Sequence, residues 1–148
     1  METVVVGVDG SEGANAALRF AVGEAALRKA RLRIVAAWSI PVAAYGGGFA
    51  PPLDSKALDS FQDGARRVAD EALATAKKLQ PSVECEAVAL EGQPAEALLE
   101  QAGDPTLIVV GNRGLGGFAS LLLGSVSQQV VHHASCPVVV VHHPAGTA

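Results

Sequence analysis

Aromatic residues are scarce in this chain of 148 residues: Phe, Trp and Tyr make up 4% of it, although 49% of the residues are hydrophobic. A core of this composition must be built from Ala, Val and Leu, which suits a buried parallel sheet. The length fits one domain, residues 1–148, with no room for a second. No apolar run reaches the ~18 residues that mark a transmembrane helix, so we expect no membrane span.

Positive charge and cysteine are also in short supply. The formal net charge is -4 at pH 7, which argues against a nucleic-acid binder because such proteins carry a basic stripe. The chain holds two cysteines, Cys85 and Cys136, and it opens without the basic and apolar regions of a secretion signal. We therefore expect a cytoplasmic, reducing environment in which both thiols act as small apolar residues.

Apolar residues alternate between strand spacing and helix spacing along the chain. The spacing predicts strands over Thr3 to Val8, Leu32 to Trp38, Val83 to Leu90, Leu107 to Val110 and Val138 to Val141. It predicts helices over Gly13 to Lys29, Asp54 to Leu79, Ala95 to Gln101 and Ala119 to His133, the last with a fresh start near Gly124. Regular alternation of this kind predicts a doubly wound α/β domain, with a parallel sheet and helices on both of its faces.

Local signals refine this outline. Ser39 to Leu53 contains three prolines and three consecutive glycines, so we expect a surface loop that is long enough to act as a lid. Glu84 and Glu86 lie on one face of the third strand, which places that strand at a border of the sheet. Ser11 has the residue type and position of an N-cap for the first helix.

Two clusters of polar residues are interpreted as having no binding role. The adjacent histidines His132-His133 and His142-His143 are not expected to bind metal, because neighbouring side chains diverge and no Asp or Glu follows Asp104. The basic residues from Arg28 to Arg33 are interpreted as a helix end and a solvated strand edge.

A glycine loop follows the fourth predicted strand, at Gly111, Gly114, Gly116 and Gly117. Ligands of open α/β sheets bind beyond the carboxyl ends of the strands, and glycines let backbone N–H groups line a phosphate cradle. A Walker loop is excluded, because no lysine follows Lys78. A dinucleotide site is disfavoured, because no acidic residue follows the loop to bind a ribose hydroxyl.

The remaining motif is Gly111-x2-Gly114-x9-Gly124-Ser125, and with it the chain resembles the universal stress protein family, whose ATP-binding members carry Gly-x2-Gly-x9-Gly-Ser/Thr. Val6 to Glu12 is similar to the family's opening strand and turn, and His133 to Val138 resembles its entry to the last strand. The resemblance covers Thr3 to His142. It implies a five-stranded sheet in the order 3-2-1-4-5, with a switch point between strands 1 and 4.

The resemblance also implies a site for ATP, with Mg²⁺ as a candidate companion. Asp9 would accept a hydrogen bond from the adenosine end, and Ala37 would line the adenine pocket. Ribose and phosphates would be held by Gly111, Asn112, Gly114, Gly116, Gly124, Ser125 and Val126. Arg113 is the only Lys or Arg after Lys78, so it is the obvious phosphate partner. The alternatives without a ligand are that Asp9 caps the first helix and that Arg113 points to solvent.

The function expected from these features is that of an ATP-binding stress-response regulator whose nucleotide state alters the Ser39 to Leu53 loop. The resemblance implies a homodimer through the last strand, Val138 to Val141, whose β-branched edge needs a cover. Two alternatives stay open: a slow ATPase or phosphotransferase that uses Asp9 as its nearest carboxylate, and a dimeric scaffold without nucleotide. The choice among ATP, ADP and AMP stays open as well.

Overall fold

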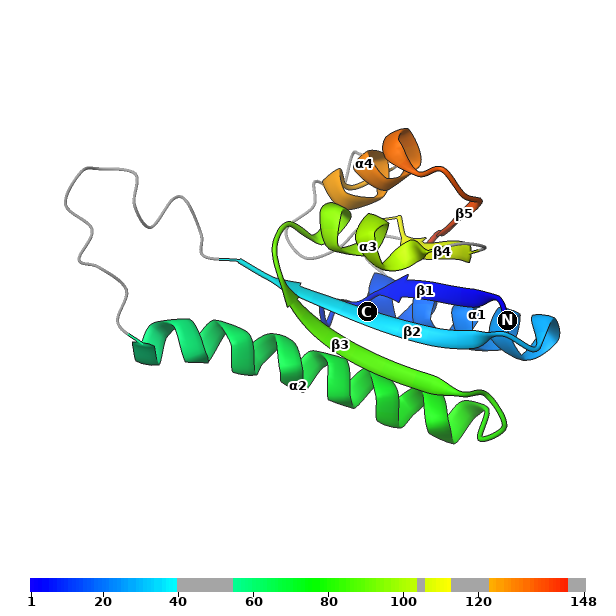
Figure 1. Ribbon diagram of the computed structural model, residues 1–148, viewed down its shortest axis with the longest axis horizontal. Coiled ribbons are helices and arrows are strands. Elements are labelled where there is room, and N and C mark those ends of the chain that lie inside the picture. The colour runs from blue at the N-terminus through cyan, green and yellow to red at the C-terminus, as the bar shows by residue number, and fades with distance from the viewer. Residues whose placement is uncertain (40–54, 104–105, 113–122, 144–148) are drawn as a thin grey trace.

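The computed structural model describes residues 1–39, 55–103, 106–112 and 123–143, which form alternating strands and helices (Figure 1). In chain order these are β1 (Thr3–Gly7), α1 (Glu12–Arg28), β2 (Arg31–Trp38), α2 (Ser55–Leu79), β3 (Cys85–Glu91), α3 (Pro94–Ala102), β4 (Thr106–Gly111), α4 (Ser125–His133) and β5 (Val138–Val141). The predicted elements are confirmed, and their ends shift by one or two residues. For the last helix, the part predicted over residues 119–122 lies outside the described residues, and α4 begins beside Gly124, as expected.

The five strands are parallel and lie in the order β3-β2-β1-β4-β5. β1 is central: Val6 pairs in register with Ile34 of β2 on one side and with Val109 of β4 on the other. The chain leaves β1 toward β2 and β3 and then crosses to β4, so the strand order reverses between β1 and β4. The order and the switch point that the family resemblance implied are therefore confirmed, as are the edge positions of β3 and β5.

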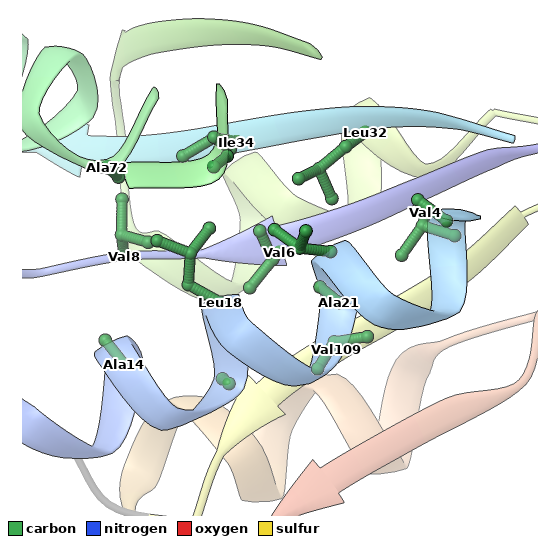
Figure 2. Close-up of a cluster of buried hydrophobic side chains, with 14 of the residues drawn as sticks. Val4, Val6, Val8, Ala14, Leu18, Ala21, Leu32, Ile34, Ala72 and Val109 are labelled. Atoms are coloured by element: carbon green, nitrogen blue, oxygen red, sulfur yellow. The ribbon is translucent and has the colours of Figure 1, made fainter. Parts of the chain in front are cut away.

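Two helices cover each face of the sheet. α1 and α2 pack on one face, in the core shown in Figure 2, and α3 and α4 pack on the other. Successive strand residues point to opposite faces, so β1 contributes Val4 and Val6 to the first core and Val5 to the second. All three valines have 0% exposure. A central strand buried on both faces explains why Thr3 to Val8 is a continuous apolar run.

Alanine supplies most of the helical contribution to the core. The buried residues of α2 are Ala69, Ala72 and Ala76, which lie on one side of a helix of 25 residues. α1 likewise buries Ala17 and Ala21 against the valines of β1 and β4. Small side chains on the helices bring their backbones close to the sheet, so the interior is filled without aromatic residues, as the composition required.

The arginines around β2 form ion pairs with glutamates. Arg28 bonds Glu24 at 3.0 Å within α1, and Arg33 of β2 bonds Glu86 of β3 at 2.6 Å. The Glu24 hydrogen bond raises the pKa of the Arg28 guanidinium, which therefore stays charged. Because these pairs are partly exposed, solvent screens them and they contribute little to folding.

Cys85 and Cys136 are half-buried free thiols on opposite faces of the sheet. Burial raises the pKa of both thiols above the ordinary value; Lys77 opposes this rise at Cys85, and backbone hydrogen bonds oppose it at Cys136. Both thiols are therefore protonated at neutral pH, which fits the expected role as small apolar residues.

The end of β4 lies very close to the start of α1. A Cβ atom added to Gly111 would lie 2.8 Å from the carbonyl oxygen of Gly13 and 2.9 Å from its carbonyl carbon. Both atoms belong to the backbone, so they cannot move aside as a flexible side chain can. Glycine at position 111 is therefore required for packing, whatever else the loop does.

Replacing a buried leucine of α1 should destabilise the fold far more than replacing an exposed one. Leu18 is 1% exposed and Leu27 is 81% exposed. We expect Leu18→Ala to lower the free energy of unfolding by about 2–5 kcal/mol and Leu27→Ala to change it by less than about 0.5 kcal/mol. Urea denaturation followed by circular dichroism measures both, and similar losses would contradict the assigned burial.

A second prediction concerns the contact between β4 and α1. Gly111→Ala should destabilise the protein by about 1–3 kcal/mol, because its methyl group meets the Gly13 backbone. Gly23→Ala is the matched control, since an added Cβ at this helical position meets nothing within 4 Å. It should stabilise α1 by about 0.5–1 kcal/mol. The same denaturation measurement applies, and an unchanged stability of Gly111→Ala would refute the close approach.

Candidate functional site

The candidate site lies where the carboxyl ends of β1 and β4 meet. These strands are neighbours at the switch point, and parallel strands end at the same edge of the sheet. β1 ends at Gly7 and β4 ends at Gly111. The segments that follow them, through Asp9 and Asn112, therefore leave the sheet side by side. This is the position at which open α/β sheets bind ligands.

Asp9 lies in the turn between β1 and α1, where it is exposed. One carboxylate oxygen, Oδ1, accepts a hydrogen bond from the Ser11 N–H at 2.9 Å. Ser11 is the N-cap of α1, as predicted: its hydroxyl accepts from the Ala14 N–H at 3.1 Å. Gly10, between them, has φ 86°, in the left-handed region that favours glycine. Asp9 therefore bonds the turn that begins α1, which is close to the alternative that it caps this helix. Its carboxylate still lies at the edge of the sheet where the site was predicted.

Ala37 lies near the carboxyl end of β2, beside β1. It is half-buried and packs on the face of the sheet that α3 and α4 cover. Its register partner in β3 is Leu90, which packs in the same cluster. An apolar pair of this kind at the edge of the sheet suits the wall of a pocket for a flat apolar ring.

Asn112, the first residue after β4, is 5% exposed and bonds two segments of the chain, the end of β5 and the start of α4. Its N–H donates to the Val141 carbonyl of β5, and its side-chain Oδ1 accepts from the His143 N–H, both at 2.9 Å. Its own carbonyl accepts from the Gly124 N–H. The side-chain oxygen of this predicted nucleotide contact is therefore bonded to the protein itself.

The start of α4 is held against that same carbonyl. Gly124 is the N-cap and makes no side-chain cap bond, Ser125 is exposed at the first helical position, and Val126 packs among the residues of the core beneath α4. The first turn of a helix directs backbone N–H groups and a partial positive charge outward. The Gly124 N–H is already donated to Asn112, so the N–H groups available to an anion belong to the residues after it.

Ser127 is a residue of the candidate site that sequence reasoning missed. Its side chain is buried, and its hydroxyl lies 3.2 Å from the Asn112 carbonyl oxygen and 3.1 Å from the Gly124 carbonyl oxygen. It therefore pins the loop end to the helix start. Serine in the first turn of a helix, two residues after Gly-Ser, is a weak signal for such a bond, because serine often bonds nearby carbonyls.

Three predicted contacts, Arg113, Gly114 and Gly116, lie outside the described residues, and so does the predicted lid apart from Ser39. The described part beyond Lys78 contains neither Lys nor Arg. Near the switch point, the described polar groups are the carboxylates of Asp9 and Glu12, backbone N–H and carbonyl groups, and the imidazole of His143. His143 is one of these groups: its Nε2 lies 3.2 Å from Oε2 of Glu12, in the first turn of α1.

Searches for other kinds of site were confined to the described residues. No group of three or more His, Cys, Asp or Glu side chains there could hold a metal ion. The rings of His132 and His133 are tilted, with centroids 6.5 Å apart. None of the described helices is long and apolar enough to cross a membrane.

Comparison with known proteins gives concordant matches. The model of the universal stress protein family matches residues 1–142. A universal stress protein of Thermus aquaticus is 42% identical over 142 residues, which cover 95% of this chain and 98% of that protein. A longer relative from Mycobacterium tuberculosis is 37% identical, and the match spans 94% of this chain but 47% of the relative.

Solved structures agree. A universal stress protein in complex with cAMP is 31% identical, with a TM-score of 0.68, over 95% of this chain and 97% of its own. The universal stress protein from Archaeoglobus fulgidus in complex with dAMP is 27% identical, with a TM-score of 0.68, over 95% and 98% respectively. The family match spans nearly the whole chain and agrees with the observed strand order, so this protein belongs to the universal stress protein family.

Proposed function

We propose that this protein binds an adenine nucleotide at the switch point between β1 and β4, with ATP as the leading candidate and Mg²⁺ as a companion ion. The observation that carries the proposal is the start of α4, which Asn112 and Ser127 hold beside the carboxyl end of β4. A helix N-terminus fixed at a switch point is a ready anion site. The similar structures with cAMP and dAMP support the choice of an adenine nucleotide.

Each part of the nucleotide would meet a different element. Ala37 and its apolar neighbours would line the adenine, and Asp9 would accept a hydrogen bond from the adenosine end. The ribose and phosphates would lie along Gly111, Arg113, Gly114, Gly116, Ser125 and Val126. Gly124 would contribute close approach rather than its N–H, because Asn112 already accepts that hydrogen bond.

The local charges favour holding a nucleotide over processing it. The exposed acids described near the switch point are Asp9 and Glu12, and both already have hydrogen-bond partners. A phosphoryl-transfer site needs cations placed around the transferred group, and Arg113 is the only Lys or Arg after Lys78. We therefore propose a cytoplasmic stress-response regulator in which the nucleotide is a signal.

Calorimetry on nucleotide-stripped protein tests the proposal. ATP, ADP, AMP and cAMP are titrated separately, and we expect saturable binding of at least one of them. Gly114→Val should abolish that binding, because a branched side chain would fill the space into which the phosphates fit. Its fold should persist, as circular dichroism and the melting temperature would report.

The control is Gly64→Val on α2, where an added Cβ meets nothing within 4 Å. It should bind nucleotide as the wild type does. Absence of heat with all four nucleotides would overturn the proposal, and unchanged affinity in Gly114→Val would move the site away from the glycine loop.

We also propose that the protein forms a homodimer through β5. The Pro137 carbonyl accepts a hydrogen bond from Ile108 of β4, and the Val141 carbonyl accepts one from Asn112, the residue after β4. Carbonyls alternate in direction along a strand, so the backbone groups of Val138 and Val140 point to the open edge. A second copy of β5 could pair there and cover four β-branched residues that are half-buried in the single chain.

Proline substitutions in β5 distinguish its pairing with a second copy from its pairing with β4. Val140→Pro removes an outward N–H and should give a folded monomer, because proline is tolerated on edge strands. Val139→Pro removes a donor that faces β4 and should reduce stability. Light scattering coupled to gel filtration gives the mass; a monomeric wild type or a dimeric Val140→Pro protein would contradict the proposed interface.

A further inference from the structure

The exit of β5 is tied into the candidate site through Asn112. The Oδ1 atom of this residue accepts from the His143 N–H at 2.9 Å, two residues after β5 ends. Its main-chain carbonyl accepts from the Gly124 N–H and the Ser127 hydroxyl, where α4 starts. One buried residue therefore connects two segments that lie far apart in the sequence.

The two sets of bonds constrain one another. The side chain of Asn112 accepts a hydrogen bond from His143, and the backbone N–H of Asn112 donates one to Val141, two residues earlier on the same segment. With both fixed, the Asn112 carbonyl has one direction, and that direction determines where the Gly124 N–H and the first turn of α4 lie. Buried, fully bonded polar groups of this kind restrict a structure to one arrangement.

His143 has a second contact, with the first turn of α1. Its Nε2 lies 3.2 Å from Oε2 of Glu12, in the first turn of α1. The Glu12 side chain is 68% exposed and that of His143 is 33% exposed, so this contact is weaker than the backbone bond to Asn112. Together the two contacts place His143 between the start of α1 and the segment after β4.

We infer that Asn112 is a positioning residue of the nucleotide site, which holds the start of α4 in its binding geometry through the His143 N–H. The inference rests on the proposed function. It adds that the chain segment after β5 belongs to the framework of the site, and that Asn112 acts through His143 and Gly124 and not through contact with the nucleotide.

Two variants of one residue isolate the bond. His143→Ala removes the imidazole and retains the N–H, whereas His143→Pro removes both. Neither variant changes a proposed nucleotide contact. ATP affinity is measured by calorimetry on stripped protein, and exchange of the Gly124 amide is measured by NMR without nucleotide. His142→Ala, which removes the neighbouring exposed imidazole, is the control for histidine loss.

We expect His142→Ala to match the wild type and His143→Ala to bind ATP within about threefold of it, as befits an exposed contact. His143→Pro should bind about tenfold more weakly than His143→Ala, because Asn112 loses its donor. Its Gly124 amide should exchange at least about tenfold faster, since the carbonyl that holds this amide is no longer oriented.

Asn112→Leu removes the acceptor of the same hydrogen bond. Combined with His143→Pro it should cost no more affinity than the larger single change, because both remove one interaction. Equal affinity of His143→Pro and His143→Ala would overturn the inference. So would faster Gly124 exchange with unchanged affinity, which is the result of a merely structural role. If wild-type protein binds none of the four nucleotides, the proposed function fails as well, and that outcome is distinct from the other two.

Discussion

The pairing of β1 with both β2 and β4 is the constraint on which the rest of the structure depends. It buries Val4, Val5 and Val6 completely and places β1 between the two halves of the sheet. Because crossovers between parallel strands are right-handed, chain segments that leave β1 on opposite sides cover opposite faces. The switch point, the two separate cores and the meeting of the β1 and β4 ends all follow from that one placement.

Helix and strand positions could be predicted because the signals are local. The N-cap role of Ser11 could be predicted from its residue type and its position before the first helix, and the structure has it. The apolar run of β1 agrees with its observed burial on both faces. Strand order could not be predicted from local signals, because periodicity does not say which strands are neighbours. It came from the resemblance to the family.

The bonds around Asn112 were out of reach of sequence reasoning. Its partners His143 and Gly124 lie 31 and 12 residues away, and no pattern links a polar residue after one strand to an N–H after another. Sequence reasoning gave Asn112 a polar role from its place in the motif. The geometry adds what that polarity is bonded to, since its Oδ1 and its carbonyl each accept from a different segment. Ser127 was missed for the same reason: its acceptors include a carbonyl that lies close only in the folded chain.

The glycines of the motif divide into two kinds once contacts are known. Gly111 faces the Gly13 backbone, so its lack of a side chain is a packing requirement that would hold without any ligand. Gly124 donates its N–H to the protein and so cannot give the same hydrogen to a phosphate. A glycine motif can therefore persist in a chain for structural reasons alone, and its presence argues for nucleotide binding only in combination with a fixed helix start. In this chain Asn112 and Ser127 fix the start of α4 beside the end of β4, and the proposed anion site rests on that arrangement.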